Sequence, residues 1–204
     1  YAIWENEIFN RSLRRFYYLH SQLAGDLPEQ KLKVDPETGV MRSRGRPVRS
    51  RYVLTDSSVQ LGGRELDQDP RTGMTLYETR GPLRQVSQVT GLYPNDTWSG
   101  RYASYTRLNC HGGKLEVGLA SDHGLFTKPQ TVYARVGGQE VARVRVAPGA
   151  VADLVVPLPS GERVCNVDFE VTPTAIPAEV TKGFNPDVRE LGIHFTRFEY
   201  KPRA

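Results

Sequence analysis

The chain has 204 residues, of which 38% are apolar and 25% are charged, as expected for a globular protein with one good core. Its 27 lysines and arginines are interspersed with 23 acidic residues, so the net charge of +4 excludes a uniformly basic surface. No stretch approaches the roughly 20 consecutive apolar residues of a membrane-spanning helix, which excludes a span within this sequence.

The first segment, residues 3–19, fits two kinds of secondary structure. Ile8, Leu13 and Phe16 fall near one face of a helix, whereas Arg15–Leu19 has the composition of a strand. We therefore expect a short helical or irregular extension at the N-terminus, with either a helix alone or a helix followed by a strand.

This extension is expected to cover residues 1–50 and to pack on a main domain over residues 51–204, the two forming one structural unit. The first residue is Tyr1 rather than Met, and we interpret the chain as a mature product or an excised part of a longer protein. A membrane region outside this sequence is therefore compatible with it.

Residues 25–51 are polar and rich in turn signals. Gly25–Pro28 and Asp35–Gly39 precede five arginines within Met41–Arg51, and we expect an irregular, exposed excursion. Such a basic run could meet nucleic-acid phosphates, lipid headgroups or an anionic polymer. We favour a solvated loop and predict no nucleic-acid partner, because the sequence contains no recognisable nucleic-acid reading element.

From residue 51 onward, short runs rich in Val, Tyr, Thr, Ile and Leu alternate with Gly, Pro, Asp and Ser, which is typical of β-structure. The predicted strands are Arg51–Thr55, Val59–Leu61, Met74–Glu78, Leu83–Thr90, Arg101–Leu108, Lys114–Ala120, Gln130–Val136, Glu140–Val146, Ala152–Leu158, Val164–Val171 and Gly192–Tyr200.

The strand spacing leaves no room for long helices and favours an all-β fold. Gly137-Gly138 lies between two runs with period-two alternation and predicts a two-residue hairpin. We predict an antiparallel β-sandwich of the jelly-roll type, in which the late strands return across the sandwich to pair with early ones.

The two cysteines, Cys110 and Cys165, both lie in strand-like sequence and lack metal-type spacing. We predict one disulfide between distant parts of the chain, which indicates an oxidising compartment. Two buried free thiols are the alternative interpretation.

Gly91–Arg101 is a turn-forming segment between two predicted strands, and it contains the residue types from which sugar sites are built. An aromatic ring stacks on the apolar face of a pyranose, and charged or amide groups bind its hydroxyls. The ligand-binding residues predicted here are Tyr93, Asn95, Asp96, Trp98 and Arg101, with Trp98 as the stacking ring. Alternatively, Trp98 is buried and Arg101 pairs with Asp96.

A second loop, Asn185–Glu190, precedes the last predicted strand. Its Asp187 and Arg189 are further candidates for ligand binding. The alternative is a structural salt bridge between these two residues that fixes the last strand.

Several motifs point to one family. The chain resembles jelly-roll modules attached to actinobacterial membrane glycosyltransferases and related envelope proteins. The resemblance rests on short motifs: Gly91-Leu-Tyr-Pro94, Trp98-Ser-Gly100, Asn185-Pro-Asp-Val-Arg-Glu-Leu-Gly192, Trp4-Glu-Asn-Glu-Ile-Phe-Asn-Arg-Ser12, Val34-Asp-Pro-Glu-Thr-Gly39 and Arg51-Tyr-Val-Leu-Thr-Asp56. It implies an extracytoplasmic, carbohydrate-binding-like domain of a polytopic membrane protein.

The resulting hypothesis is a non-catalytic module with no catalytic residues, bound to cell-envelope glycan and tethered through its own membrane domain. The first alternative is a structural or assembly sandwich without a ligand of its own. The second is a glycoside hydrolase, for which Asp96, Asp122, Asp187 and Glu190 are the available acids. A serine hydrolase lacks the required nucleophile elbow, because Thr97–Gly100 offers only a Ser-Gly pair.

No organic cofactor is expected. A structural Ca²⁺ is the one candidate cofactor, since jelly-roll carbohydrate modules often carry one and Ca²⁺ takes carboxylate oxygens. The candidate ligands are Asp153, Asp168 and Asp187.

Overall fold

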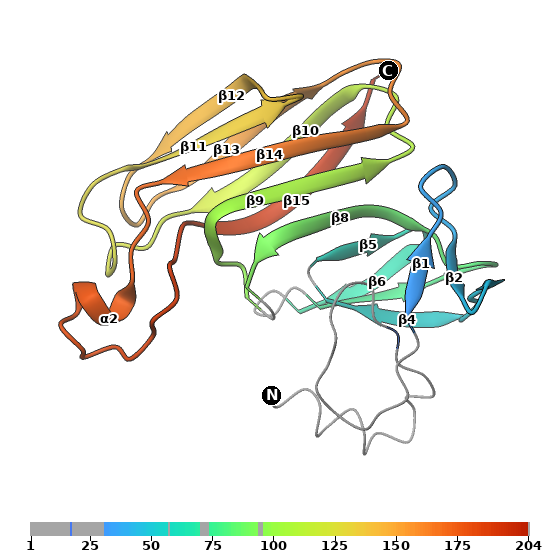
Figure 1. The fold of residues 1–204 in the computed structure, drawn as a ribbon, viewed down its shortest axis with the longest axis horizontal. Helices are drawn as coiled ribbons and strands as arrows, with labels where there is room; N and C mark the ends of the chain where they lie inside the picture. The colour runs from blue at the N-terminus through green and yellow to red at the C-terminus, as the bar shows by residue number, and fades with distance from the viewer. Residues whose placement is uncertain (1–16, 18–30, 57, 70–73, 94–95, 204) are drawn as a thin grey trace.

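The computed structural model describes residues 17, 31–56, 58–69, 74–93 and 96–203, and its main part is a sandwich of two antiparallel sheets (Figure 1). The first layer has the strand order β12-β11-β14-β9-β8-β5. Its strands are β5 (Val59–Leu61), β8 (Gln85–Leu92), β9 (Ser99–Leu108), β11 (Gln130–Val136), β12 (Gln139–Val146) and β14 (Val164–Thr172).

The second layer places β10 (Gly113–Ala120) between β13 (Val151–Leu158) and β15 (His194–Pro202). The core lies between the layers because apolar residues alternate along the strands and point inward. Phe169 of the first layer meets Phe195 of the second edge to face, with ring centroids 5.3 Å apart. Both rings are almost completely buried.

The long-range pairing follows the predicted topology. β14 pairs with β9, and the last strand, β15, pairs with β10, in both cases antiparallel. The prediction of an all-β antiparallel sandwich is therefore confirmed. The predicted hairpin is also confirmed, because Gly137 and Gly138 both have positive φ (57° and 80°) in the turn between β11 and β12.

A smaller part of the molecule precedes the sandwich and has its own apolar cluster. It consists of the sheets β1-β2-β3 and β4-β7-β6. Their strands are β1 (Leu32–Val34), β2 (Met41–Ser43), β3 (Arg46–Pro47), β4 (Tyr52–Thr55), β6 (Arg64–Gln68) and β7 (Thr75–Glu78). Leu32, Met41 and Val48 are buried in this cluster together with residues of β5 and β7.

The structure differs here from the sequence-based expectation of an irregular excursion. Residues 31–50 contain three short strands, because isolated apolar residues among the arginines are enough to fill one side of a small sheet. The β2–β3 turn uses Arg44 and Gly45, both with positive φ. Arg44, Arg46 and Arg49 are exposed, as predicted for the arginine cluster.

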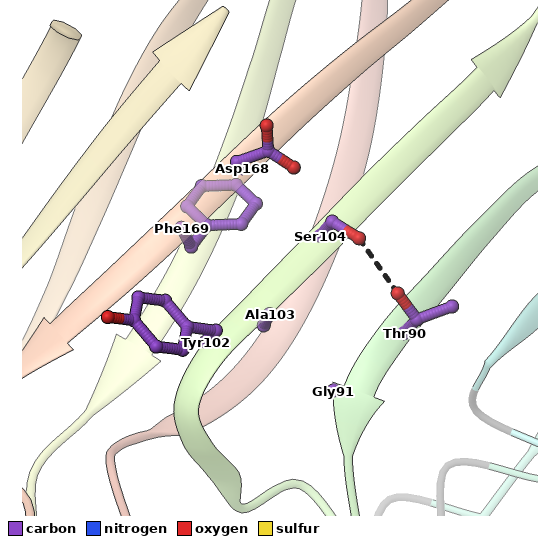
Figure 2. A pocket seen from close by; sticks show the side chains of 7 residues that line it. All are labelled: Thr90, Gly91, Tyr102, Ala103, Ser104, Asp168 and Phe169. Carbon is purple, nitrogen blue, oxygen red and sulfur yellow. Dashed lines mark hydrogen bonds between the residues drawn. The ribbon is translucent and has the colours of Figure 1, made fainter. Parts of the chain in front are cut away.

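The pairing of β8 with β9 is irregular at one point, where the register shifts between Thr90 and Leu92. Gly91 lies at this shift with φ 83°, and a Cβ atom there would collide with the carbonyl oxygen of Tyr102. Before the shift, the hydroxyls of Thr90 and Ser104 are 2.7 Å apart across the two strands (Figure 2). Only glycine fits the close approach of the two backbones at position 91.

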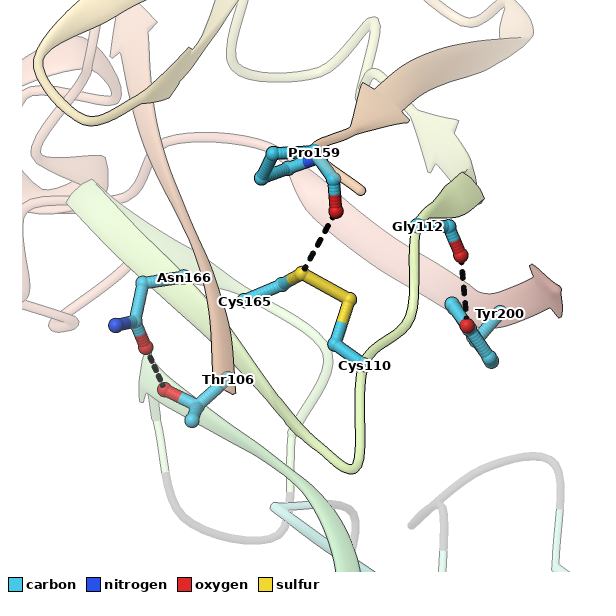
Figure 3. Close-up of a disulfide and its surroundings, with 7 residues drawn as sticks. All are labelled: Thr106, Cys110, Gly112, Pro159, Cys165, Asn166 and Tyr200. Atoms are coloured by element: carbon cyan, nitrogen blue, oxygen red, sulfur yellow. Dashed lines mark hydrogen bonds between the residues drawn. A yellow bond between two sulfur atoms is a disulfide. The ribbon is translucent and has the colours of Figure 1, made fainter. Parts of the chain in front are cut away.

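The predicted disulfide between Cys110 and Cys165 is confirmed (Figure 3). It joins the segment after β9 to the start of β14, and both sulfur atoms lie in the main core. The bond closes a loop with a sequence separation of 55, which restricts the unfolded chain.

Among the described residues, no helix is long and apolar enough to cross a membrane. The expected helix or strand over residues 3–19 lies outside the described residues, apart from Tyr17. The division at residue 50 between extension and main domain stays a prediction.

Candidate ligand-binding site

Three loops meet at the end of the sandwich where α2 (Pro177–Val180) projects beyond the two layers (Figure 1). Their described residues are 93 and 96–98 in the first loop, 121–126 in the second and 175–191 in the third. The first and third are tied together by backbone pairing, in which Ser99 donates to Ile193 and Gly192 donates to Ser99. Gly192 is required there because a Cβ atom would collide with the carbonyl oxygen of Gly100.

The third loop is closed by its own hydrogen bonds. Ala175 and Leu191 form an isolated antiparallel bridge at its base, and the Ala178 amide donates to the Asp187 carbonyl at 2.9 Å. Within the loop, the Thr181 hydroxyl accepts a hydrogen bond from the Asn185 amide at 2.8 Å. This bonding gives the 175–191 loop a defined shape, as a binding loop needs.

Arg189 connects the first and third loops. Its guanidinium binds both carboxylate oxygens of Asp187, with an Nη2–Oδ2 distance of 2.7 Å, and its Nη1 donates to Asp96 Oδ2 at 3.2 Å. It also lies 4.8 Å from the ring centroid of Tyr93, in cation–π geometry. Its hydrogen bonds hold the pKa of Asp187 below the usual range, which keeps this carboxylate charged.

Trp98 is buried, with 9% of its surface exposed, in a small cluster with Phe126 and Leu191. One side of its indole is covered by His194, whose ring centroid is 3.7 Å away. The His194 Nδ1 is 2.7 Å from the hydroxyl of Thr97, and burial lowers the pKa of His194. Trp98 therefore forms part of the floor of the site and does not present an open ring face.

A pocket of about 520 Å³ lies above this floor, between the second and third loops. Its lining combines apolar and polar side chains and comprises Trp98, Asp122, Gly124, Leu125, Pro177, Thr181, Phe184, Asn185, Pro186, Asp187 and Leu191. Phe184 is 94% exposed, so its aromatic ring is the one in the lining that is free to contact a ligand.

Two polar groups of the pocket retain hydrogen-bonding capacity. Asp122 accepts a hydrogen bond from Gly124 through Oδ1, and Asn185 accepts one from Asp187 through Oδ1. Within the described ranges, neither Asp122 Oδ2 nor the side-chain nitrogen of Asn185 has a protein partner. These atoms offer one acceptor and one donor group beside the Phe184 ring.

The structure brings Tyr93, Asp96, Trp98, Asp187 and Arg189 together, although the sequence-predicted loops are far apart in the chain. Arg101 lies elsewhere, on β9, where it pairs with Glu170 at 3.4 Å. The alternative pairing of Arg101 with Asp96 is therefore wrong, because Arg189 occupies Asp96. The predicted salt bridge between Asp187 and Arg189 is confirmed. Asn95 lies outside the described residues.

Sequence reasoning did not single out Phe184 or assign Asp122 to binding. Phe184 follows Lys182-Gly183 in a segment without apolar periodicity. The one sequence feature that could indicate a binding role for Phe184 is the presence of an aromatic residue in a loop that contains Gly and Pro. The sequence patterns indicate Asp122 only as one of the acids available to a glycoside hydrolase.

The candidate Ca²⁺ ligands do not form a cation site. Asp153 pairs with Arg197, and Asp187 pairs with Arg189, so two of the three carboxylates are already bound to arginine. The described residues contain no group of three or more His, Cys, Asp or Glu side chains that could hold a metal ion. Asp153, Asp168 and Asp187 therefore do not together fit Ca²⁺ as ligands. A bound Ca²⁺ stays an untested expectation.

No family model and no curated protein sequence matches the chain. Among solved structures, CsCBM6-3 from Clostridium stercorarium, in complex with cellobiose, is similar over 61% of this chain and 86% of that chain. The identity is 12% and the TM-score is 0.27. A similarity of this size does not define a family or a ligand for the chain.

Proposed function

We propose that this chain is a non-catalytic carbohydrate-binding module whose site is the pocket under Phe184. The observation that carries the proposal is the exposed Phe184 ring beside Asp122 and Asn185 on hydrogen-bonded loops. An aromatic ring contacts the apolar face of a sugar, and fixed polar groups bind its hydroxyls.

The test is affinity electrophoresis of the purified chain in gels that contain soluble neutral or acidic polysaccharides. Specific retardation by one polysaccharide, reduced in Phe184→Ala, is the expected result. Serum albumin serves as the non-binding control. If no polysaccharide, including envelope polysaccharide, retards the wild-type chain more than albumin, the proposal is wrong.

A binding role without hydrolysis is supported by the contacts of Asp187, one of the candidate acids. A glycosidase needs one carboxylic acid that stays protonated and a second carboxylate facing it across the bond. Both oxygens of Asp187 are bound by Arg189, which lowers the pKa of Asp187 and makes it a poor proton donor. Incubation of the chain with the retarding polysaccharide should release no reducing ends.

We further propose that the module works outside the cytoplasm, tethered to a membrane-bound glycosyltransferase that acts on the cell envelope. The Cys110–Cys165 disulfide supports an oxidising compartment. Intact mass of the protein from its source cells, with thiols blocked at lysis, should show no free thiol. Two blocked thiols would contradict this location.

A structural role is the second candidate, favoured by exposed apolar side chains on the same loop. Val180, Phe184 and Val188 are 49%, 94% and 76% exposed, and such side chains also suit contact with the module's own membrane domain. In that case Phe184→Ala and Val188→Ala should both weaken association with the membrane domain, and neither should change retardation by polysaccharide.

A further inference from the structure

The outer face of the six-stranded sheet carries a second set of polar and aromatic side chains, separate from the loop pocket. Along β14, Cys165, Val167 and Phe169 point into the core, so the residues between them point outward. Along β9, Ala103 and Tyr105 point inward in the same way. The outward side chains on these two strands are Asn166, Asp168 and Glu170 on β14 and Tyr102, Ser104 and Thr106 on β9.

The register aligns these side chains into rows that cross the strands. Glu170 lies opposite Tyr102 on one side and Tyr133 on the other. In the next row, Asp168 lies opposite Ser104 and Arg135, and Ser104 lies opposite Thr90. Directly opposed residues on one face have Cβ atoms about 5 Å apart, so each row presents neighbouring groups to one ligand.

The two carboxylates on this face differ in their partners. Glu170 is held by Arg135 at 2.8 Å and by Arg101 at 3.4 Å, and these bonds lower its pKa. Asp168, in contrast, is exposed and has no hydrogen bond or ion pair with any described residue. The face therefore has one neutralised carboxylate and one carboxylate that is free to accept hydrogen bonds.

A shallow pocket of about 270 Å³ lies between these groups. It lies where the register of β8 and β9 shifts at Gly91, and Figure 2 shows Tyr102, Ser104, Thr90 and Asp168 on three neighbouring strands around it. Tyr102 is 62% exposed, and the Arg101 guanidinium lies over one side of its ring, 5.7 Å from the centroid. The opposite side of the ring is therefore the one available to a ligand.

We propose that this face is a second glycan site, which binds a neutral chain of sugars laid across β8, β9 and β14. One sugar stacks on Tyr102, and its hydroxyls donate to Asp168 and exchange hydrogen bonds with Ser104 and Thr90. A neutral glycan fits because the free Asp168 carboxylate accepts hydrogen bonds from hydroxyls, and the two arginines and two carboxylates of this face balance in charge. The ligand class rests on the proposed function, but the site is independent of the Phe184 pocket.

The test maps amide chemical shifts of the wild-type chain during titration with linear neutral oligosaccharides of glucose, mannose or arabinose. One of them should shift the amides of Tyr102–Ser104 and Asp168. Tyr102→Ala should weaken binding at this face by about fivefold or more, and Asp168→Asn should weaken it in the same direction. Tyr52→Ala is the matched control, because Tyr52 is also an exposed strand tyrosine (51%) but lies on β4.

The two proposals fail separately. Shifts confined to Phe184–Asp187 would overturn the second site and leave the loop pocket intact. Shifts confined to the sheet face would support the second site and show that the loop pocket does not bind that oligosaccharide. Equal affinity of wild-type and Tyr102→Ala at the sheet amides would overturn the proposed role of Tyr102 and, with Asp168→Asn also unchanged, the site itself. The unchanged fold of each variant is checked by its amide spectrum.

Discussion

Arg189 donates a hydrogen bond to Asp96 across a sequence separation of 93, with an Nη1–Oδ2 distance of 3.2 Å. This contact links the loop before β9 to the loop before β15. Because Arg189 also binds Asp187 and lies over Tyr93, one guanidinium orders both loops that border the Trp98 floor. The ion-paired cluster therefore supports the loops around the pocket.

Replacing Arg189 by lysine should destabilise the chain. Lysine keeps the charge but loses the planar, multidentate contact with Asp187 and Asp96. We expect a loss of about 1 kcal/mol, limited by the partial exposure of the side chain. Urea unfolding measures it. Arg143→Lys is the control, since Arg143 is more exposed and its contact with Glu140 is 3.8 Å long; equal effects of the two substitutions would contradict the role of Arg189.

His194 should make stability depend on pH near neutrality. Burial lowers its pKa below 6.5, although Asp96 and Asp122 oppose this, so below pH 6.5 the unfolded chain binds protons that the folded chain does not. The contribution of His194 to the free energy of unfolding is therefore present above pH 6.5. It is lost as the pH falls through the pKa of His194 in the folded chain. His194→Asn should flatten this part of the urea-unfolding profile, and the exposed His111→Asn should not. A slope that persists in His194→Asn would assign the titration to another group.

Gly91 should be intolerant of a side chain. Gly81→Ala provides a matched control because Gly81 also has positive φ (96°, against 83° for Gly91) but has open space around it. The backbone strain alone should cost about 1 kcal/mol in Gly81→Ala. Gly91→Ala should cost more than about 2 kcal/mol, because its Cβ also meets the β9 backbone. Thermal and urea unfolding measure the loss of stability in Gly81→Ala and in Gly91→Ala. Equal losses of stability in the two variants would show that the β8 and β9 backbones are not in close contact at Gly91.

The disulfide should supply a large part of the stability. The double variant Cys110→Ala/Cys165→Ala should lose about 3–4 kcal/mol, as expected for a loop with a sequence separation of 55. Reductant should lower the unfolding midpoint of the wild-type chain and leave the double variant unchanged. A wild-type midpoint that is insensitive to full reduction would contradict this expectation.

The strands of the sandwich could be predicted because their burial follows the sequence. In β14, inward apolar residues such as Val167 alternate with outward polar ones such as Asp168, and this period-two pattern is visible without a structure. β6 was not predicted because all of its residues, Arg64–Gln68, are exposed and show no alternation. Short strands of this kind depend on pairing with a neighbour.

The site could be predicted only in part. The turn chemistry around Tyr93 and Asp187 indicates the two loops of the candidate site, but the pairing of Asp96 with Arg189 depends on the topology that returns β15 to β10. The exposure of Phe184 and the burial of Trp98 also follow from how the loops pack. Sequence patterns contain residue types and periods, and they do not contain these long-range contacts.

The central claim is that the pocket under Phe184 binds carbohydrate, and calorimetric titration tests it most directly. The wild-type chain, Phe184→Ala and Val188→Ala are titrated with an oligosaccharide of the retarding polysaccharide. Val188 is the matched control because it is exposed on the same loop but is not part of the pocket lining. The account predicts that Phe184→Ala weakens binding about fivefold or more while Val188→Ala leaves it unchanged. Equal affinities for wild-type and Phe184→Ala would contradict it.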